Sequence, residues 1–144
     1  MWFKSSSPRP SSQGSSSQQS TSAPDAKNPQ HKRHYGEAIE QQAEAWLMQH
    51  GLQPLERNYG IRAGEIDLIM QHNQVLVFIE VRYRADDDHG SGAESITYQK
   101  QRKLRKTAEH YLQQHFGNCP PDCRFDVISA SGQPVQFDWI QNAF

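Results

Sequence analysis

The spacing of apolar residues predicts two amphipathic helices in this chain. The first runs from about Tyr35 to His50, where apolar side chains recur at i, i+4, i+7 and i+8 (Ile39, Ala43, Trp46, Leu47). Gly51 follows in the position that favours the end of a helix. The second begins at Ser95 or Thr97, both suitable N-caps, and extends to about His115. Its inward face is expected to hold Leu104, Ala108, Tyr111 and Leu112.

Shorter stretches with a different pattern predict strands. Residues 55–62 form the first, and "VLVFIEV" at 75–81 is nearly continuous in apolar residues, as is typical of a central strand buried on both faces. Between them "EIDLIM" at 65–70 alternates, so two sets of side chains take opposite faces: Ile66, Leu68 and Met70 against Glu65, Asp67 and Ile69. Two more strands, 124–130 and 135–140, follow the second helix. The order implies an α/β sandwich around a mixed sheet.

Composition indicates a single domain at residues 32–144. The chain has 144 residues and is 35% apolar with a formal net charge of −1; the apolar deficit is concentrated in a Ser/Gln/Pro stretch near the start. Such a stretch buries too little apolar surface to offset the entropy of ordering it, so residues 1–31 are expected to form a disordered tail. No run approaches the roughly 18 apolar residues of a membrane span. A soluble, cytoplasmic protein without a membrane partner is expected.

An acidic loop and a pair of cysteines each raise the question of a metal site. Consecutive loop residues seldom converge on one ion, so "ADDDHGSGAE" at 85–94 is interpreted as a solvated loop. Zinc sites pair two close cysteines with a second pair of ligands, and none follows Cys119 and Cys123 at suitable spacing. Two thiols in a proline-rich loop fit a cytosolic protein.

The candidate chemistry lies in the hairpin "GEIDLIMQHNQVLVFIEVRYR" at 64–84. Because strand side chains alternate, Phe78, Glu80 and Arg82 share a face. If the turn pairs Gln71 with Gln74, Asp67 faces Phe78 and lies diagonal to Glu80. Diagonal neighbours are roughly 7–8 Å apart, which lets two carboxylates reach one ion. A slip of one residue places the two acids on opposite faces.

Two explanations of these buried acids stand side by side. A divalent cation could offset their charge, since Mg²⁺ favours one or two carboxylates, waters and a phosphate oxygen. Alternatively, Arg82 and Arg84 could pair with Asp67, Glu65 and Glu80 in a network that catalyses nothing.

Several motifs together carry a family resemblance. "GEIDLI", "LVFIEVRYR", "KQRKLRKTAEHYL", "CRFDVI" and "WIQNAF" resemble the YraN family of uncharacterised bacterial proteins over about residues 34–144. That family resembles archaeal Holliday-junction resolvases and the D…(D/E)-x-K nuclease superfamily. The resemblance implies a restriction-endonuclease-like αβββαβ core, a mixed central sheet with flanking helices, here with one more strand at the C-terminus.

The resemblance also implies a site. Asp67 and Glu80 fall on the two metal-binding acids, with the Val81 backbone carbonyl as a third ligand of Mg²⁺ or Mn²⁺. Glu40 falls on the first-helix glutamate; from the helix alone it is an ordinary flank residue. Arg82 stands where the superfamily has lysine. Arginine stays charged in proteins and cannot act as a base, but it can hold a phosphate or balance charge.

A basic run on the second helix is the best local signal for nucleic acid, because the chain as a whole has no positive field. It comprises Lys100, Arg102, Lys103, Arg105 and Lys106, which could contact phosphates. Three functions remain open: a metal-dependent endonuclease acting on structured or branched DNA, a non-catalytic nucleic-acid-binding module on the same fold, and an interaction scaffold that uses the tail and the acidic loop. A homodimer would suit a symmetric DNA junction.

Overall fold

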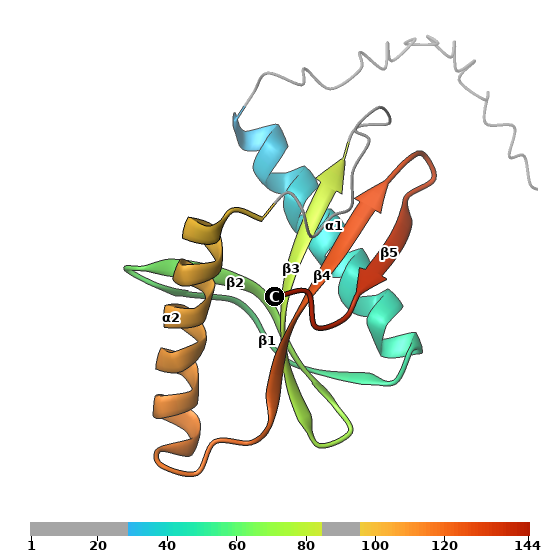
Figure 1. Ribbon diagram of the computed structural model, residues 1–144. Helices are drawn as coiled ribbons and strands as arrows, with labels where there is room; N and C mark the ends of the chain where they lie inside the picture. Colours follow the sequence, from blue (N-terminus) through green and yellow to red (C-terminus); the bar gives the residue numbers. More distant parts are fainter. Residues whose placement is uncertain (1–28, 85–95) are drawn as a thin grey trace, which may run out of the picture.

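The computed structural model describes residues 29–84 and 96–144, and its architecture confirms the expected α/β fold (Figure 1). The elements are α1 (Pro29–Gln49), β1 (Leu52–Ile61), β2 (Gly64–His72), β3 (Val75–Arg84), α2 (Tyr98–Phe116), β4 (Cys123–Ser131) and β5 (Gln136–Ile140). α1 begins six residues before the predicted start at Tyr35. Most of the predicted tail, the acidic loop and Ser95 lie outside the described residues.

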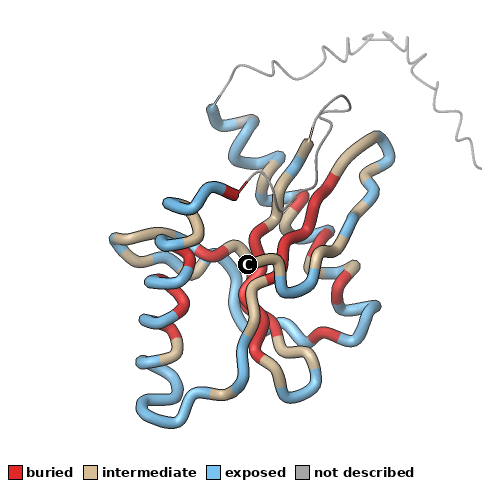
Figure 2. The backbone as a smooth tube through the Cα atoms, in the orientation of Figure 1, coloured by how far each residue is buried: buried red, intermediate tan, exposed pale blue. Residues whose placement is uncertain are grey.

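The five strands form one mixed sheet in the order β1-β2-β3-β4-β5, with β3 and β4 parallel and the other pairs antiparallel. Each helix covers one face. α1 contributes Ala43 and Leu47 to a cluster with Leu68, Val77 and Ile128 on one side. On the other side, the α2 cluster comprises Ile66, Ile69, Leu76, Phe78, Ile96, Leu104, Ala108, Tyr111 and Val127. Figure 2 shows the resulting buried layer along the central strands and the inner side of α2.

The β2–β3 hairpin has a different register from the one expected. His72 pairs with Val75 and Gln71 with Leu76, so the predicted pairing of Gln71 with Gln74 is wrong by two residues. The turn is therefore made by Asn73 and Gln74, and Asn73 adopts a φ of 58°, a left-handed conformation that asparagine tolerates well. Because the side-chain period of a strand is two, this shift changes which residues are opposite and leaves their faces unchanged.

The expected alternation along β2 breaks at Ile66, which packs in the α2 cluster and not with Leu68 and Met70. The pairing of β2 with β3 ends at Leu68, and the tip of the β1–β2 hairpin lies under α2 (Figure 1). At that tip Gly64 lies against α2 so closely that an added Cβ would be 3.2 Å from Thr107 Oγ1 and 3.3 Å from Lys103 Cβ. The hairpin tip therefore bends toward α2 because a glycine permits the contact.

Capping and packing define α2. Thr97, one of the two expected caps, accepts a hydrogen bond from Lys100 N at 3.2 Å. The buried residues of the helix are Leu104, Thr107, Ala108 and Tyr111, whereas the predicted Leu112 is only partly buried. Thr107 was not expected in the core; its hydroxyl donates to Lys103 O at 2.8 Å, which satisfies the buried polar group. No helix within residues 29–84 or 96–144 is long and apolar enough to cross a bilayer.

We expect Gly64→Ala to lower the free energy of unfolding by about 1–2 kcal/mol, because the new methyl group would crowd Thr107 and Lys103. Gly60→Ala is the matched control, since its Cβ would meet nothing closer than 3.9 Å. Urea unfolding of both variants measures the difference. Equal midpoints would contradict a close contact between the hairpin tip and α2.

Candidate metal centre

The candidate site lies where β2 and β3 separate. The two strands pair from His72 and Val75 to Leu68 and Ile79; beyond this point β2 continues alongside β1 while β3 continues alongside β4. One residue further along the same register, Asp67 is opposite Glu80. Here a side chain replaces the missing backbone partner: Asp67 Oδ2 accepts a hydrogen bond from Val81 N at 2.9 Å. The fork therefore holds two acids side by side, near enough for the charge of Glu80 to act on Asp67.

Glu80 is the more deeply buried acid, with 7% of its surface exposed. Its Oε1 lies 3.3 Å from Lys100 Nζ and 3.7 Å from Arg82 Nε. Among the residues that the structure describes, its Oε2 is buried and receives no hydrogen bond, and Arg82 Nε is buried and donates none. A buried charged oxygen without a partner is costly. Two cations thus lie beside one oxygen of the Glu80 carboxylate, whereas no N–H group of the described residues donates to the other oxygen.

The electrostatics of Asp67 reflect this crowding of negative charge. Burial, and then repulsion from Glu80, raises the pKa of Asp67 to about 8, although the Val81 N–H acts in the opposite direction. Glu40 on α1 adds a smaller repulsion that also raises the pKa of Asp67. The carboxylates of α1, β2 and β3 therefore influence one another, as the expected grouping of Glu40, Asp67 and Glu80 requires.

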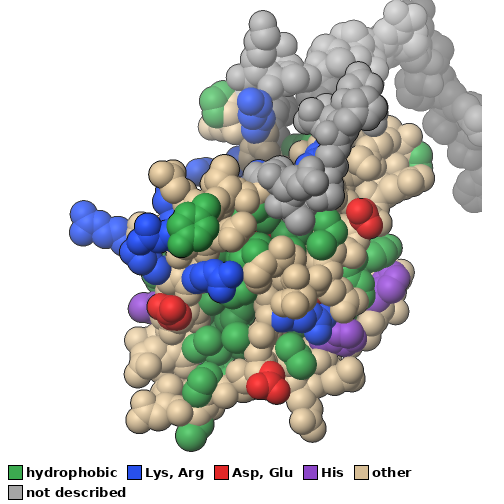
Figure 3. All heavy atoms as spheres, viewed as in Figure 1, with side chains coloured by type: hydrophobic (Ala, Val, Ile, Leu, Met, Phe, Trp, Pro, Cys, Tyr) green, Lys and Arg blue, Asp and Glu red, His purple; other side chains and the backbone are tan. Residues whose placement is uncertain are grey.

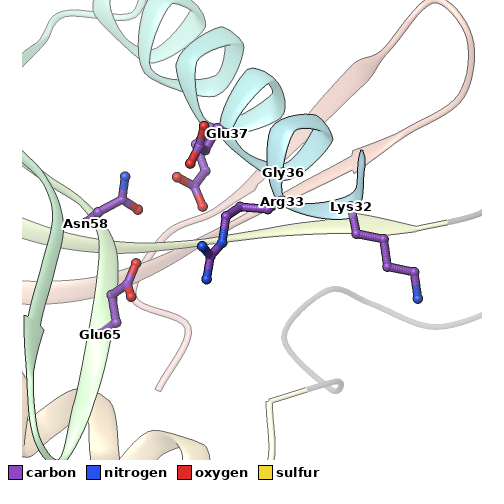
Figure 4. A pocket seen from close by; sticks show the side chains of 7 residues that line it. Lys32, Arg33, Gly36, Glu37, Asn58 and Glu65 are labelled. Atoms are coloured by element: carbon purple, nitrogen blue, oxygen red, sulfur yellow. The ribbon is translucent and has the colours of Figure 1, made fainter. Parts of the chain in front are cut away.

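Glu40 lies at the edge of the site, in a hollow of about 420 Å³ lined by Lys32, Arg33, Gly36, Glu37, Glu40, Asn58 and Glu65. Burial, and then repulsion from Glu65, raises the pKa of Glu40. With its amide oriented so that the nitrogen faces the acids, Asn58 donates to Glu40 at 2.9 Å and to Glu65 at 3.1 Å. Figure 4 shows Arg33 extending from α1 across the hollow toward Asn58 and Glu65.

Asn58 is a residue of the site that the sequence patterns did not reveal. It has a φ of 53° within β1, a conformation uncommon for a non-glycine residue. Only the motif "NYG", with two residues that favour irregular backbone, hinted at a local distortion there.

The donor set fits a hard divalent cation that keeps part of its hydration. Within residues 29–84 and 96–144, no group of three or more His, Cys, Asp or Glu side chains is arranged to hold a metal ion by itself. Asp67 and Glu80 offer two carboxylates, and within the same residues no N–H group occupies Glu80 Oε2. Mg²⁺ is typically bound by one or two carboxylates, with water and substrate oxygens completing the shell.

The basic side chains of α2 do not lie in one row. Figure 3 shows Lys and Arg side chains gathered over the N-terminal half of the helix. Lys100 turns to Glu80, whereas Arg102, Lys103 and Lys106 line a separate hollow with Ala63 and Gln99. Arg105 lies over the rings of Phe125 and Phe144, 5.6 and 5.5 Å from their centroids. We name Arg102, Lys103 and Lys106 the basic hollow; Arg105 lies apart from it.

We expect Asp67→Asn to stabilise the protein in the presence of EDTA, by an amount that grows with pH. Between about pH 4, where an unfolded aspartate ionises, and about pH 8, the folded wild type retains a proton that the unfolded chain has lost. The free energy of unfolding of the wild type therefore decreases as the pH rises through this window, whereas that of the asparagine variant does not. The expected gain at pH 8 is on the order of 1–3 kcal/mol.

Urea unfolding at pH 4, 6 and 8 measures this gain, with the exposed Asp138→Asn as the control. A gain that is the same at all three pH values would contradict a raised pKa for Asp67.

Comparison with known proteins identifies the family. Residues 39–130 match the model of the uncharacterised protein family UPF0102. A UPF0102 protein of Aeromonas hydrophila is 54% identical over 110 residues, which cover 76% of this chain and 83% of that protein. UPF0102 proteins of Nitrosomonas europaea and Xanthomonas oryzae are 49% and 44% identical, and the matches cover 76% and 81% of this chain and 92% and 95% of those proteins. The resemblance of the motifs to the YraN family of uncharacterised bacterial proteins is thereby confirmed, and the chain belongs to the UPF0102 family.

Proposed function

We propose that this protein is a metal-dependent endonuclease that hydrolyses phosphodiester bonds in structured or branched DNA. The observation that carries the proposal is the close pair of acids at the fork of β2 and β3, where, among the described residues, no N–H group donates to the buried Oε2 of Glu80 beside Asp67. An acid pair that only stabilised the fold would be expected to have N–H donors on both carboxylates. The resemblance of the motifs to junction resolvases supplies the reaction class and the substrate.

Asp67 and Glu80 would hold Mg²⁺ or Mn²⁺, with the Val81 carbonyl as a further ligand. When bound, such an ion activates a water molecule and offsets the charge of the phosphate. The Val81 N–H orients the Asp67 carboxylate, and Glu40, oriented by Asn58, would assist from α1 by accepting hydrogen bonds from water. Arg82 balances the charge of Glu80, since a guanidinium keeps its proton.

DNA would lie across the fork with its backbone on two basic surfaces. One is the basic hollow on α2, and the other is formed by Lys32 and Arg33 at the start of α1, beside Glu40. Contacts of this kind bind phosphates without reading sequence, which suits an enzyme that recognises the shape of its substrate. A homodimer would place two such sites on a symmetric junction.

One observation favours a second function, a non-catalytic nucleic-acid-binding module. Glu80 Oε1 already contacts both Lys100 and Arg82, so part of its charge is neutralised without any metal. In a binding module these contacts would be permanent, and the basic surfaces alone would act.

We expect the wild type to cleave branched DNA with Mg²⁺ or Mn²⁺, and Asp67→Ala and Glu80→Ala to lose at least about 100-fold in rate, because each removes a carboxylate that would hold the metal ion. Labelled four-way junctions and linear duplexes, run on gels with and without EDTA, measure the cleavage. Asp138→Ala, an exposed acid on β5, is the control and should cleave like the wild type.

The outcomes separate the two functions. Salt-sensitive DNA binding without cleavage would favour the binding module. Cleavage at full rate in both site variants would indicate a contaminating nuclease and would contradict the assignment of the site.

We expect Lys106→Ala to weaken DNA binding and to reduce the slope of log K against log salt by about one, since one phosphate contact is lost. Gln113→Ala, seven residues further along α2 and exposed, is the matched control. Fluorescence anisotropy in EDTA at several salt concentrations measures both slopes. An unchanged slope in Lys106→Ala would mean that the basic hollow does not contact DNA.

A further inference from the structure

Lys100 differs from every other basic residue of α2 in what it contacts. Its Nζ lies 3.3 Å from Glu80 Oε1, and within residues 29–84 and 96–144 no other lysine or arginine of this helix forms an ion pair with an acid. The two partners lie 20 residues apart in sequence, one on α2 and the other on β3 of the sheet that α2 covers. A basic side chain of the second helix therefore belongs to the candidate metal centre.

The backbone of Lys100 is held firmly, whereas its amine is adaptable. Thr97 caps the helix through the Lys100 N–H, and Gln101 donates from its side chain to the carbonyl of the buried Ile96 at 3.3 Å. The Lys100 side chain is 40% exposed, against 8% for the Glu80 side chain. Its ammonium has three donors and lies beside only one oxygen of Glu80 in this ion pair, so it can also meet a ligand that arrives from solvent.

Arg82 is less suited to contact a substrate. Its Nε is buried 3.7 Å from Glu80 Oε1 and makes no hydrogen bond with the part of the chain that the structure describes. It lies two residues after Glu80 on the same face of β3, so its guanidinium is directed by the strand. An ammonium on a flexible stem is a compact point charge that moves more readily to a phosphate oxygen.

We propose that Lys100 is a catalytic residue of the proposed nuclease, and that Arg82 is a positioning residue for Glu80. The inference rests on the proposed function. Lys100 would keep one N–H on Glu80 and place another on a non-bridging oxygen of the scissile phosphate. As the oxygen of a water molecule bonds to phosphorus, the bond from phosphorus to the leaving oxygen breaks, and a proton of that water ends on the leaving oxygen. Lys100 stays protonated throughout and stabilises the negative charge that develops on the phosphate.

The test uses Lys100→Met in the full-length protein, with two readouts expected to change in opposite directions. Cleavage of a four-way junction should fall by about 100-fold, because a charge at the reacting phosphate is lost. The affinity for Mn²⁺ alone, measured by calorimetry, should rise several-fold, because the ammonium no longer competes for Glu80. Arg57→Met on β1, which also removes one positive charge, should leave both readouts near the wild type.

Several results would overturn the assignment. If Lys100→Met cleaves within about threefold of the wild type while Asp67→Ala is inactive, Lys100 is not catalytic and the proposed function stands. If cleavage and Mn²⁺ affinity fall together, Lys100 has only a structural role. If the wild type itself does not cleave, the proposed function fails, and the catalytic role of Lys100 fails with it.

Discussion

The hydrogen bond from the Val81 N–H to the Asp67 carboxylate is the interaction on which the candidate site depends. The sheet divides at this point because the tip of the β1–β2 hairpin packs under α2, where Gly64 allows close contact, while β3 stays beside β4. A backbone N–H inside a protein needs an acceptor. Where the neighbouring strand no longer supplies a carbonyl, the carboxylate of Asp67 accepts the hydrogen bond instead. Asp67 is thereby held opposite Glu80.

The hydrogen bond that satisfies the Val81 N–H also brings the negative charge of Asp67 next to that of Glu80. Two carboxylates and a nearby third lie in a partly buried fork, and their mutual repulsion adds to the cost of burial, which is why the pKa of Asp67 is raised to about 8. Lys100 and Arg82 lie beside one oxygen of Glu80, and no N–H group of the described residues donates to the other. The buried apolar clusters on both faces of the sheet stabilise the fold against this cost. Sites that retain such local conflict are often functional.

Much of this arrangement follows from periodicity alone. The spacing of Ile39, Ala43 and Leu47 predicted the buried face of α1, and the apolar run at 75–81 predicted the central strand; both are confirmed. Asp67 and Glu80 were expected near each other even though the assumed pairing of Gln71 was wrong by two residues. The prediction survived because a shift by an even number preserves the face of every side chain. Ile66 was misplaced because alternation assumes a flat strand, and β2 bends at that residue.

The sequence by itself determined the order of the elements, their inward faces and the acids that could meet between β2 and β3, since these depend on neighbours within one or two turns or strand repeats. The tertiary structure alone decided that Lys100 reaches Glu80, that Asn58 links Glu40 to Glu65, and that Arg105 packs on Phe125 and Phe144, away from the basic hollow. Helical periodicity states which side of α2 faces the sheet, but not which strand lies beneath each turn. That choice depends on how the helix crosses the sheet, which is set by contacts between residues far apart in the chain.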